Sequence, residues 1–142
     1  MTRQRVIVVP APVPYIYDAK VIKIVDGDTV KLEVTREFVY QIDFGFHQQE
    51  RLLITRSAQE TFRLARINAP EIGTQAGKDA KEALTALLQP VAGAWKALTA
   101  KTLKQDKYGR WLLELYVQEE GKPDMNVNDW MVTFKYAVPY VE

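Results

Sequence analysis

The chain has 142 residues, of which 47% are hydrophobic and 26% charged, a composition typical of a single soluble globular domain. Its 19 Lys and Arg nearly balance 18 Asp and Glu, which excludes nucleic-acid binding by bulk positive charge but leaves a local basic cleft open. The absence of cysteine excludes disulfides, thiolate metal sites and a cysteine nucleophile, and the only histidine is His47.

The N-terminal region, residues 1–16, is expected to form an extended arm, because Pro10, Pro12 and Pro14 favour extended backbone. The domain proper is then expected over 17–142. The apolar run near the N-terminus is too short and too interrupted by proline for a signal peptide. No stretch approaches the roughly eighteen apolar residues that span a bilayer. We therefore expect a cytoplasmic protein, for which a prokaryotic or phage origin is plausible.

The first half of the domain has the pattern of a β-meander. From Tyr17 to Val34, β-branched residues predict two strands around a turn at Asp26-Gly27. Asp-Gly between alternating hydrophobic residues is a strong hairpin signal. The segments 37–46 and 51–67 continue as strands, and Gly45 suits a bulge or bend.

Asn68-Ala69-Pro70 interrupts the strand pattern, and the clearest helix follows at 77–90, where Ala and Leu recur at helical spacing before a proline. Strands are expected at 95–103 and 111–117, and a second amphipathic helix at 126–137. Meandering strands with a helix inserted before the last strands suit a small Greek-key barrel. The predicted fold is therefore α+β, mainly β, with a five-stranded OB-type barrel and two to three helices.

Several common motifs are excluded. An EF-hand loop from Asp26 would need an oxygen ligand and a glycine where Val30 and Lys31 stand. Residues 73–79 resemble a phosphate loop only faintly, because the spacing is wrong and Asp follows the lysine. His47 has no partner at metal-ligand spacing, so we expect a hairpin or surface residue rather than a catalytic base.

Oxygen ligands and arginines remain as candidates for chemistry. The segment "FRLARINAPE" carries Arg63, Arg66, Asn68 and Glu71 around a strand that ends at a proline. Side-chain alternation places the two arginines on opposite faces, and the following loop aims Asn68 and Glu71. Taken singly, this segment and "DKYGR" (106–110) are equally compatible with surface charges and ordinary turns.

Four segments in the same order resemble the staphylococcal nuclease-like (thermonuclease) family: "VIKIVDGDTVKL", "FRLARINAPE", "DKYGRWLLELYV" and "MNVNDWMVTFKYAVPY". The resemblance covers roughly residues 20–140, with 35–60 poorly constrained by it. The family's fold is an OB-type barrel with helices, in agreement with the fold expected from the residues alone.

The resemblance implies a role for each polar candidate except Arg66. Asp28, Asn68 and the backbone carbonyl of Ala69 would hold a metal ion, Ca²⁺ in this family, and Glu71 would position or activate the attacking water. The remaining implied roles are phosphate binding by Arg63 and Arg110, contacts to the substrate by Lys107 and Tyr108, and stacking on a base by Tyr140.

The chemistry of phosphodiester hydrolysis needs these residue types. The transition state builds negative charge, which a hard divalent cation with oxygen ligands and two forked guanidinium groups can neutralise. A carboxylate is the natural general base where no suitable histidine exists. The expected function is therefore a metal-dependent nuclease that cleaves DNA and also RNA with little sequence preference. The resemblance implies a calcium-dependent endonuclease whose products have 3′-phosphate ends.

Two departures from the family matter. Asn68 stands where a second metal-binding aspartate is typical, so we expect weaker or altered metal preference rather than loss of activity. The stretch between Asp28 and Arg63 is longer than usual and predicts an extended β-hairpin. That hairpin could grip nucleic acid, mediate a homodimer or merely protrude.

Other interpretations remain open. The alternative to an enzyme is a non-catalytic OB-type module that binds nucleic acid or protein, since some members of the family have lost catalytic residues. The joint presence of Asp28, Arg63, Glu71 and Arg110 favours the enzyme. A structural module in a phage or plasmid assembly has no positive support in the sequence.

Overall fold

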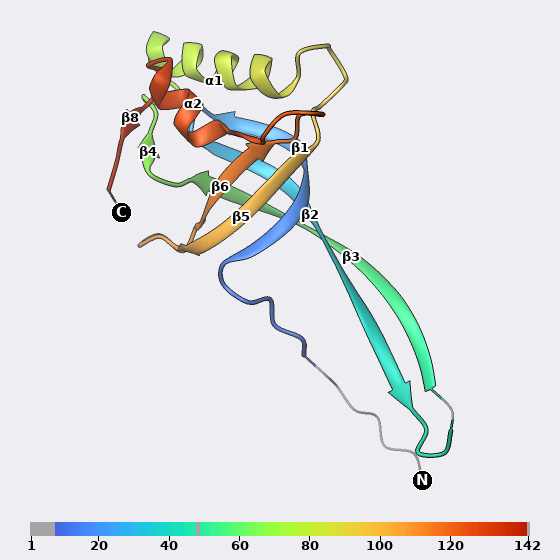
Figure 1. Ribbon diagram of the computed structural model, residues 1–142. Helices are drawn as coiled ribbons and strands as arrows, with labels where there is room; N and C mark the ends of the chain where they lie inside the picture. The colour runs from blue at the N-terminus through green and yellow to red at the C-terminus, as the bar shows by residue number, and fades with distance from the viewer. Residues whose placement is uncertain (1–7, 48, 142) are drawn as a thin grey trace.

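Alternating apolar residues form strands that close into a barrel. The computed structural model describes residues 8–47 and 49–141. The barrel strands are β1 (Tyr15–Asp26), β2 (Thr29–Asp43), β3 (Gln49–Leu64), β5 (Leu98–Gln105) and β6 (Trp111–Val117). They pair in the order β3-β2-β1-β5-β6, and a parallel pairing between β3 and β6 closes the barrel (Figure 1). The predicted OB-type, mainly β fold is confirmed.

The helix α1 (Gln75–Leu88) lies against one end of the barrel (Figure 1). It buries Ala80, Leu84 and Leu88 in the core, which is the apolar spacing that predicted it. Its N-cap is Thr74, whose hydroxyl oxygen accepts a hydrogen bond from the backbone N–H of Gly77. The helix begins and ends two residues earlier than the predicted 77–90.

The second helix, α2 (Val127–Thr133), is shorter than the predicted 126–137. It ends because Lys135 adopts a left-handed backbone with φ 64°, and the N–H groups of Tyr136 and Ala137 bond back to the carbonyl of Met131. The usual sequence signal for such an end is glycine, and none stands there. The apolar pattern therefore extended the predicted helix too far.

The remaining strands are short and pair near the C-terminal part of the chain. β7 (Met125–Asn126) pairs with β6, and β4 (Ile67–Asn68) pairs antiparallel with β8 (Val138–Pro139). The strand predicted over 51–67 is interrupted after Leu64 because Arg66 turns the chain with φ 67°. The β4–β8 pairing brings the segment after β3 beside the C-terminal segment.

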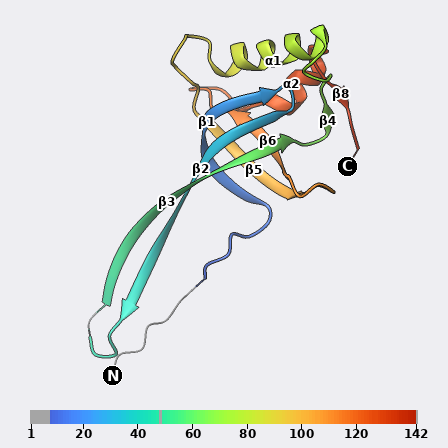
Figure 2. The ribbon, with the colours of Figure 1, turned by 180° about the vertical axis from the view of Figure 1, so that it is seen from behind.

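The β2–β3 hairpin extends well beyond the barrel (Figures 1 and 2). Its register is unbroken from the Thr29–Arg63 pair to the Asp43–Gln49 pair, which confirms the predicted extended hairpin. Gly45, with φ 85°, lies in the bend at its tip as predicted. His47 is exposed at the same tip, which confirms its prediction as a hairpin residue.

Residues 8–14 precede β1 and form neither helix nor strand. They run past the base of the hairpin, where the Arg36 guanidinium donates to the carbonyls of Val9 and Pro10 at 2.9 and 3.2 Å. The rest of the predicted arm, residues 1–7, lies outside the described residues. Among the described residues, no helix is long and apolar enough to cross a membrane.

Candidate active site

Residues from four separate segments line one open cleft of about 580 Å³ at the end of the barrel. The turn after β1, the end of β3 with the loop that follows it, the β5–β6 turn and the C-terminal segment all contribute. All nine residues for which the sequence predicted a role line this cleft: Asp28, Arg63, Asn68, Ala69, Glu71, Lys107, Tyr108, Arg110 and Tyr140.

The β1–β2 turn lies one residue later in the chain than predicted, so Asp28 belongs to the turn itself. Asp26 still pairs with Thr29, so the two loop residues are Gly27 and Asp28 rather than Asp26 and Gly27. The Asp26 carboxylate closes the turn by accepting the N–H of Asp28 at 3.0 Å. Gly27 packs tightly, because a Cβ there would lie 2.7 Å from the Cβ of Ala80. The turn itself therefore carries Asp28 into the cleft.

The Asp28 carboxylate is buried and held on both oxygens. Oδ2 accepts the backbone N–H of Ala69 at 2.9 Å, and Oδ1 accepts the Thr29 hydroxyl at 3.0 Å. Burial, followed by a side-chain hydrogen bond with Asp26, raises the pKa of Asp28 to about 6. A carboxylate that is costly to ionise in this way is favoured in its charged form by a nearby cation.

Arg63 is buried at the end of β3, beside Asp28. Its Nη2 donates to the Ile67 carbonyl at 3.1 Å and to Asn68 Oδ1 at 3.4 Å, and it lies 3.9 Å from Asp28 Oδ2. The Tyr140 ring centroid is 5.2 Å from the guanidinium carbon. A positively charged group and several oxygen atoms therefore lie close together in this part of the cleft.

Tyr140 is brought to the cleft by backbone pairing rather than by local sequence. The β4–β8 ladder pairs Ile67 with Pro139, and the N–H of Tyr140 donates to the Arg66 carbonyl at 2.8 Å. The C-terminal segment is thus attached to the loop that carries Asn68.

Glu71 has an exposed side chain on the rim of the cleft and a fixed main chain. Its carbonyl accepts both the N–H of Thr74 at 3.0 Å and the Thr74 hydroxyl at 2.6 Å. A Cβ on Gly77 would lie 1.8 Å from that carbonyl oxygen, so only glycine lets the first turn of α1 approach so closely. The start of α1 therefore holds the Glu71 loop.

In the β5–β6 turn, hydrogen bonds to Asp106 hold Arg110 in place. The Asp106 carboxylate accepts the N–H groups of Tyr108 and Arg110 at 2.8 and 2.9 Å, and the Arg110 Nε at 2.9 Å. Desolvation acts to raise the pKa of Asp106, but these hydrogen bonds outweigh it and lower that pKa below its ordinary value. Gly109 completes the turn with φ 81°. The sequence predicted a turn here but no role for Asp106, although an Asp at the start of a turn is a visible signal for one.

Besides Asp106, four further polar side chains without a predicted site role line the cleft. Asp26 and Thr29 flank Asp28, and Lys104 and Gln105 lie directly before the β5–β6 turn. Their nearness to predicted site residues in the chain was the only signal available.

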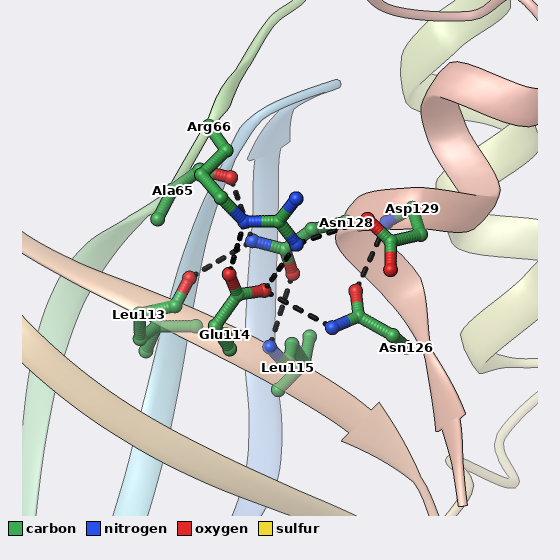
Figure 3. A network of polar contacts seen from close by, with 8 residues as sticks. All are labelled: Ala65, Arg66, Leu113, Glu114, Leu115, Asn126, Asn128 and Asp129. Atoms are coloured by element: carbon green, nitrogen blue, oxygen red, sulfur yellow. Dashed lines mark hydrogen bonds and ion pairs between the residues drawn. The ribbon is translucent and has the colours of Figure 1, made fainter. Parts of the chain in front are cut away.

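Arg66, the one polar candidate left without a role, anchors the loop behind the cleft (Figure 3). Its guanidinium forms a two-point ion pair with Glu114 on β6 and a 2.9 Å bond from Nη2 to Asp129 Oδ1 on α2. The hydrogen bond with Glu114 raises the pKa of Arg66 further above its ordinary value. Arg66 therefore joins the β3–β4 turn to both β6 and α2.

Asn128 completes this network from within the core. Its amide donates to the carbonyls of Ala65 and Leu113 at 2.9 and 3.0 Å, and its oxygen accepts the N–H of Leu115 at 3.0 Å (Figure 3). A fully buried side chain with all these bonds satisfied is a structural group. It fixes the turn that precedes Asn68.

The oxygen donors in the cleft fit a hard divalent cation. Asp28 offers a buried carboxylate, Asn68 an amide oxygen and Ala69 a backbone carbonyl, the ligand types that such cations prefer together with water. The part of the chain that the structure describes has no group of three or more His, Cys, Asp or Glu side chains arranged for a metal.

Comparison with known protein families identifies one family for this chain. A family model described as staphylococcal nuclease homologue matches residues 61–141. That range contains every residue proposed for the cleft except Asp28. A search among curated proteins finds no match to the chain.

Proposed function

Because the chain belongs to the staphylococcal nuclease homologue family, a family of nuclease-type or nucleic-acid-binding modules, we propose that it is a calcium-dependent endonuclease. It would hydrolyse phosphodiester bonds of DNA and also RNA with little sequence preference. The observation that supports this proposal is the meeting of Asp28, Arg63, Glu71 and Arg110, from three separate parts of the chain, in one cleft.

Arg63 and Arg110 would bind the phosphate. They reach the cleft from the end of β3 and from the β5–β6 turn, so together they can contact one phosphate from two sides. Guanidinium groups keep their charge and donate two parallel hydrogen bonds to phosphate oxygens. As negative charge grows on those oxygens in the transition state, both contacts strengthen, which lowers the barrier.

Glu71 would act as the general base. Its side chain is exposed on the cleft rim, while its main chain is held by Thr74. A carboxylate there can accept a proton from a water that attacks the phosphorus. The water oxygen would form a new bond to phosphorus as its proton passes to Glu71, and the bond between phosphorus and the 5′-oxygen would break. The 5′-oxygen would leave with the electron pair and take a proton from solvent, which gives the 3′-phosphate ends that the family implies.

Asp28, Asn68 and the Ala69 carbonyl would hold Ca²⁺. The ion would supply charge neutralisation at the phosphate, an effect worth several kcal/mol. Asp28 is suited to this part, because burial makes its own negative charge costly without a cation. Asn68 contributes no charge, and its oxygen also accepts a hydrogen bond from Arg63.

The aromatic and basic residues around the cleft would position the nucleic acid. The Tyr108 side chain is 72% exposed, and its ring lies near both Lys107 and Arg110. Tyr140, 40% exposed, covers the other side over Arg63. Exposed aromatic rings that can stack on any base, beside fixed cations, suit binding without sequence preference.

The decisive experiment is cleavage of single-stranded DNA, double-stranded DNA and RNA in Ca²⁺ or in chelator. We expect cleavage only with the ion, and a loss of at least about 100-fold in Glu71→Gln and in Arg110→Ala. Glu82→Gln, on the exposed side of α1, and Arg51→Ala, on the hairpin, are matched controls that should keep full activity.

Two outcomes would contradict the proposal. Cleavage that survives chelation, or that is unchanged in Glu71→Gln, would remove the assigned chemistry. Binding of DNA without any cleavage would instead identify the chain as a non-catalytic nucleic-acid-binding module.

A further inference from the structure

Within residues 8–47 and 49–141, the outer part of the β2–β3 hairpin is a two-stranded ribbon that pairs with no third strand. The pairing of β1 with β2 ends at Thr35, and β6 meets β3 only at 62–64. Among the described residues, 36–43 and 49–56 therefore form strand pairs only with each other. A two-stranded ribbon is marginally stable in water by itself and gains most from a partner that covers an apolar face.

The two faces of this ribbon differ sharply. Residues that pair across the strands share a face, and successive residues alternate between faces. One face continues the core side of the barrel, following Leu32 and Val34, and we call it the apolar ribbon face. It consists of Phe38, Tyr40, Ile42, Leu52 and Ile54.

The opposite face is polar apart from one pair, Val39 across from Leu53. Its other residues are Glu37, Gln41, Asp43, Gln49, Arg51 and Thr55. On the apolar ribbon face, Leu52 is 55% exposed and Ile42 40% exposed, although both lie on the side that the barrel buries elsewhere. The ribbon thus has the amphipathic pattern of a strand pair that is covered on one side.

Charges at the two ends of the apolar ribbon face are opposite in sign. At the barrel end, Arg36 pairs directly with Arg56, a like-charge arrangement that is unfavourable by itself. At the tip end, Glu50 pairs with Ile42. Neither Arg56 nor Glu50 forms an ion pair within the part of the chain that the structure describes. The two ends lie about 20 Å apart along the strands.

We propose that the apolar ribbon face binds the same face of a second copy of this chain, antiparallel about a two-fold axis. The axis would pass at the level of Val39 and Leu53, halfway between the charged ends. It would bring Glu50 of each copy to Arg56 of the other, and the apolar side chains between them into contact. An interface between identical patches must be self-complementary in this way.

The residue types on the apolar ribbon face fit a second copy of the chain better than they fit nucleic acid. A phosphate backbone is bound by several cations along one surface, whereas this face has an apolar centre and an acidic end. The polar face carries Glu37 and Asp43 as well as Arg51, so it does not form a basic track either. When two such faces meet in antiparallel orientation, the basic end of each lies against the acidic end of the other, and the two apolar centres lie together.

The test is the oligomeric state, measured by sedimentation velocity over a range of concentrations without divalent ions. We expect the full chain to dimerise at micromolar to tens-of-micromolar concentration, and Leu52→Lys to raise the dimer dissociation constant at least about tenfold. Leu53→Lys is a matched control, because it lies next in the chain, is similarly exposed and points to the polar face. It should dimerise like the unmodified chain.

Charge reversal tests the antiparallel arrangement. Glu50→Arg and Arg56→Glu should each weaken the dimer, and the double variant should restore it, because the exchanged charges meet again across the axis. A chain that stays monomeric at every concentration would overturn the proposal, as would equal effects of Leu52→Lys and Leu53→Lys or no rescue in the double variant. A monomer whose DNA binding is weakened by Leu52→Lys would assign the face to nucleic acid instead.

Discussion

The backbone N–H of Ala69 donates to Oδ2 of Asp28 at 2.9 Å, so the loop after β4 is attached to the turn between β1 and β2. The Leu64 N–H also donates to the Asp28 carbonyl at 2.8 Å. Asp28 is therefore held by its main chain and by its side chain. This attachment places the carboxylate next to the Arg63 and Asn68 side chains, and it makes the site sensitive to the charge of a single group.

Asp28→Asn should stabilise the metal-free protein at neutral pH. The pKa of Asp28 is about 6 in the folded chain against an ordinary 3.8, so the folded state binds this proton more tightly than the unfolded state. Protonation of Asp28 therefore stabilises the folded state fully below about pH 4, and this stabilisation is lost as the pH rises through 6. We expect Asn, which stays neutral, to raise the free energy of unfolding by about 2 kcal/mol at pH 7.5 and by little at pH 4.

Denaturant unfolding in chelator at both pH values measures this difference. Asp124→Asn, at an exposed carboxylate, is the control and should change stability little at either pH. A variant that is less stable than the unmodified chain at pH 7.5 would show that the Asp28 charge is not costly in the folded state.

Asn68→Asp should tighten Ca²⁺ binding by about tenfold or more, because it adds a carboxylate beside Asp28. Asn68→Ala, which removes the oxygen, should weaken it. Isothermal titration calorimetry with Ca²⁺ alone measures both without reference to cleavage. An affinity that is the same in all three proteins would show that Asn68 serves only to accept the hydrogen bond from Arg63.

Gly77→Ala should disturb the Glu71 loop, because the added Cβ would lie 1.8 Å from the Glu71 carbonyl oxygen. Relief of this overlap requires the start of α1 or the loop to move, at a cost of about 2–3 kcal/mol. Gly73→Ala is a control in the same loop, since a Cβ there meets nothing within 4 Å. Thermal unfolding of both variants checks the difference, and equal melting temperatures would contradict the tight approach.

Arg66→Met should destabilise the fold by about 2–4 kcal/mol, because it leaves the mostly buried Glu114 carboxylate without its cation. Methionine keeps much of the apolar stem of the Arg66 side chain, and like arginine it has to adopt the left-handed backbone conformation at this position. Asp129→Asn, at the exposed end of the network, should cost less than about 1 kcal/mol. A double-mutant cycle with Glu114→Gln should show coupling of about 1–2 kcal/mol; additive effects would mean that the pair contributes nothing.

Local patterns in the sequence determined most of the secondary structure, whereas the candidate site residues follow from the resemblance of four ordered segments to a known family. The alternation along β1, β2 and β5 follows from the two-residue period of a strand, and the apolar spacing in α1 follows from the helical period. Where a boundary depended on backbone conformation without glycine, as at Arg66 and Lys135, the pattern extended the element too far. At Arg66, the left-handed residue is held by its contacts with Glu114 and Asp129, which are distant in the chain.

Only the tertiary structure decided how the site is held together. The role of Arg66 is not visible in the sequence, because Glu114 and Asp129 are distant in the chain and meet it only after folding. The role of Asp106 depends on the fold of its turn, which forms its hydrogen bonds to Arg110. The contrast between the two ribbon faces likewise requires the register of β2 against β3. Sequence specifies periodicity and residue type locally, whereas burial, pKa and pairing depend on which distant groups the closed barrel brings into contact.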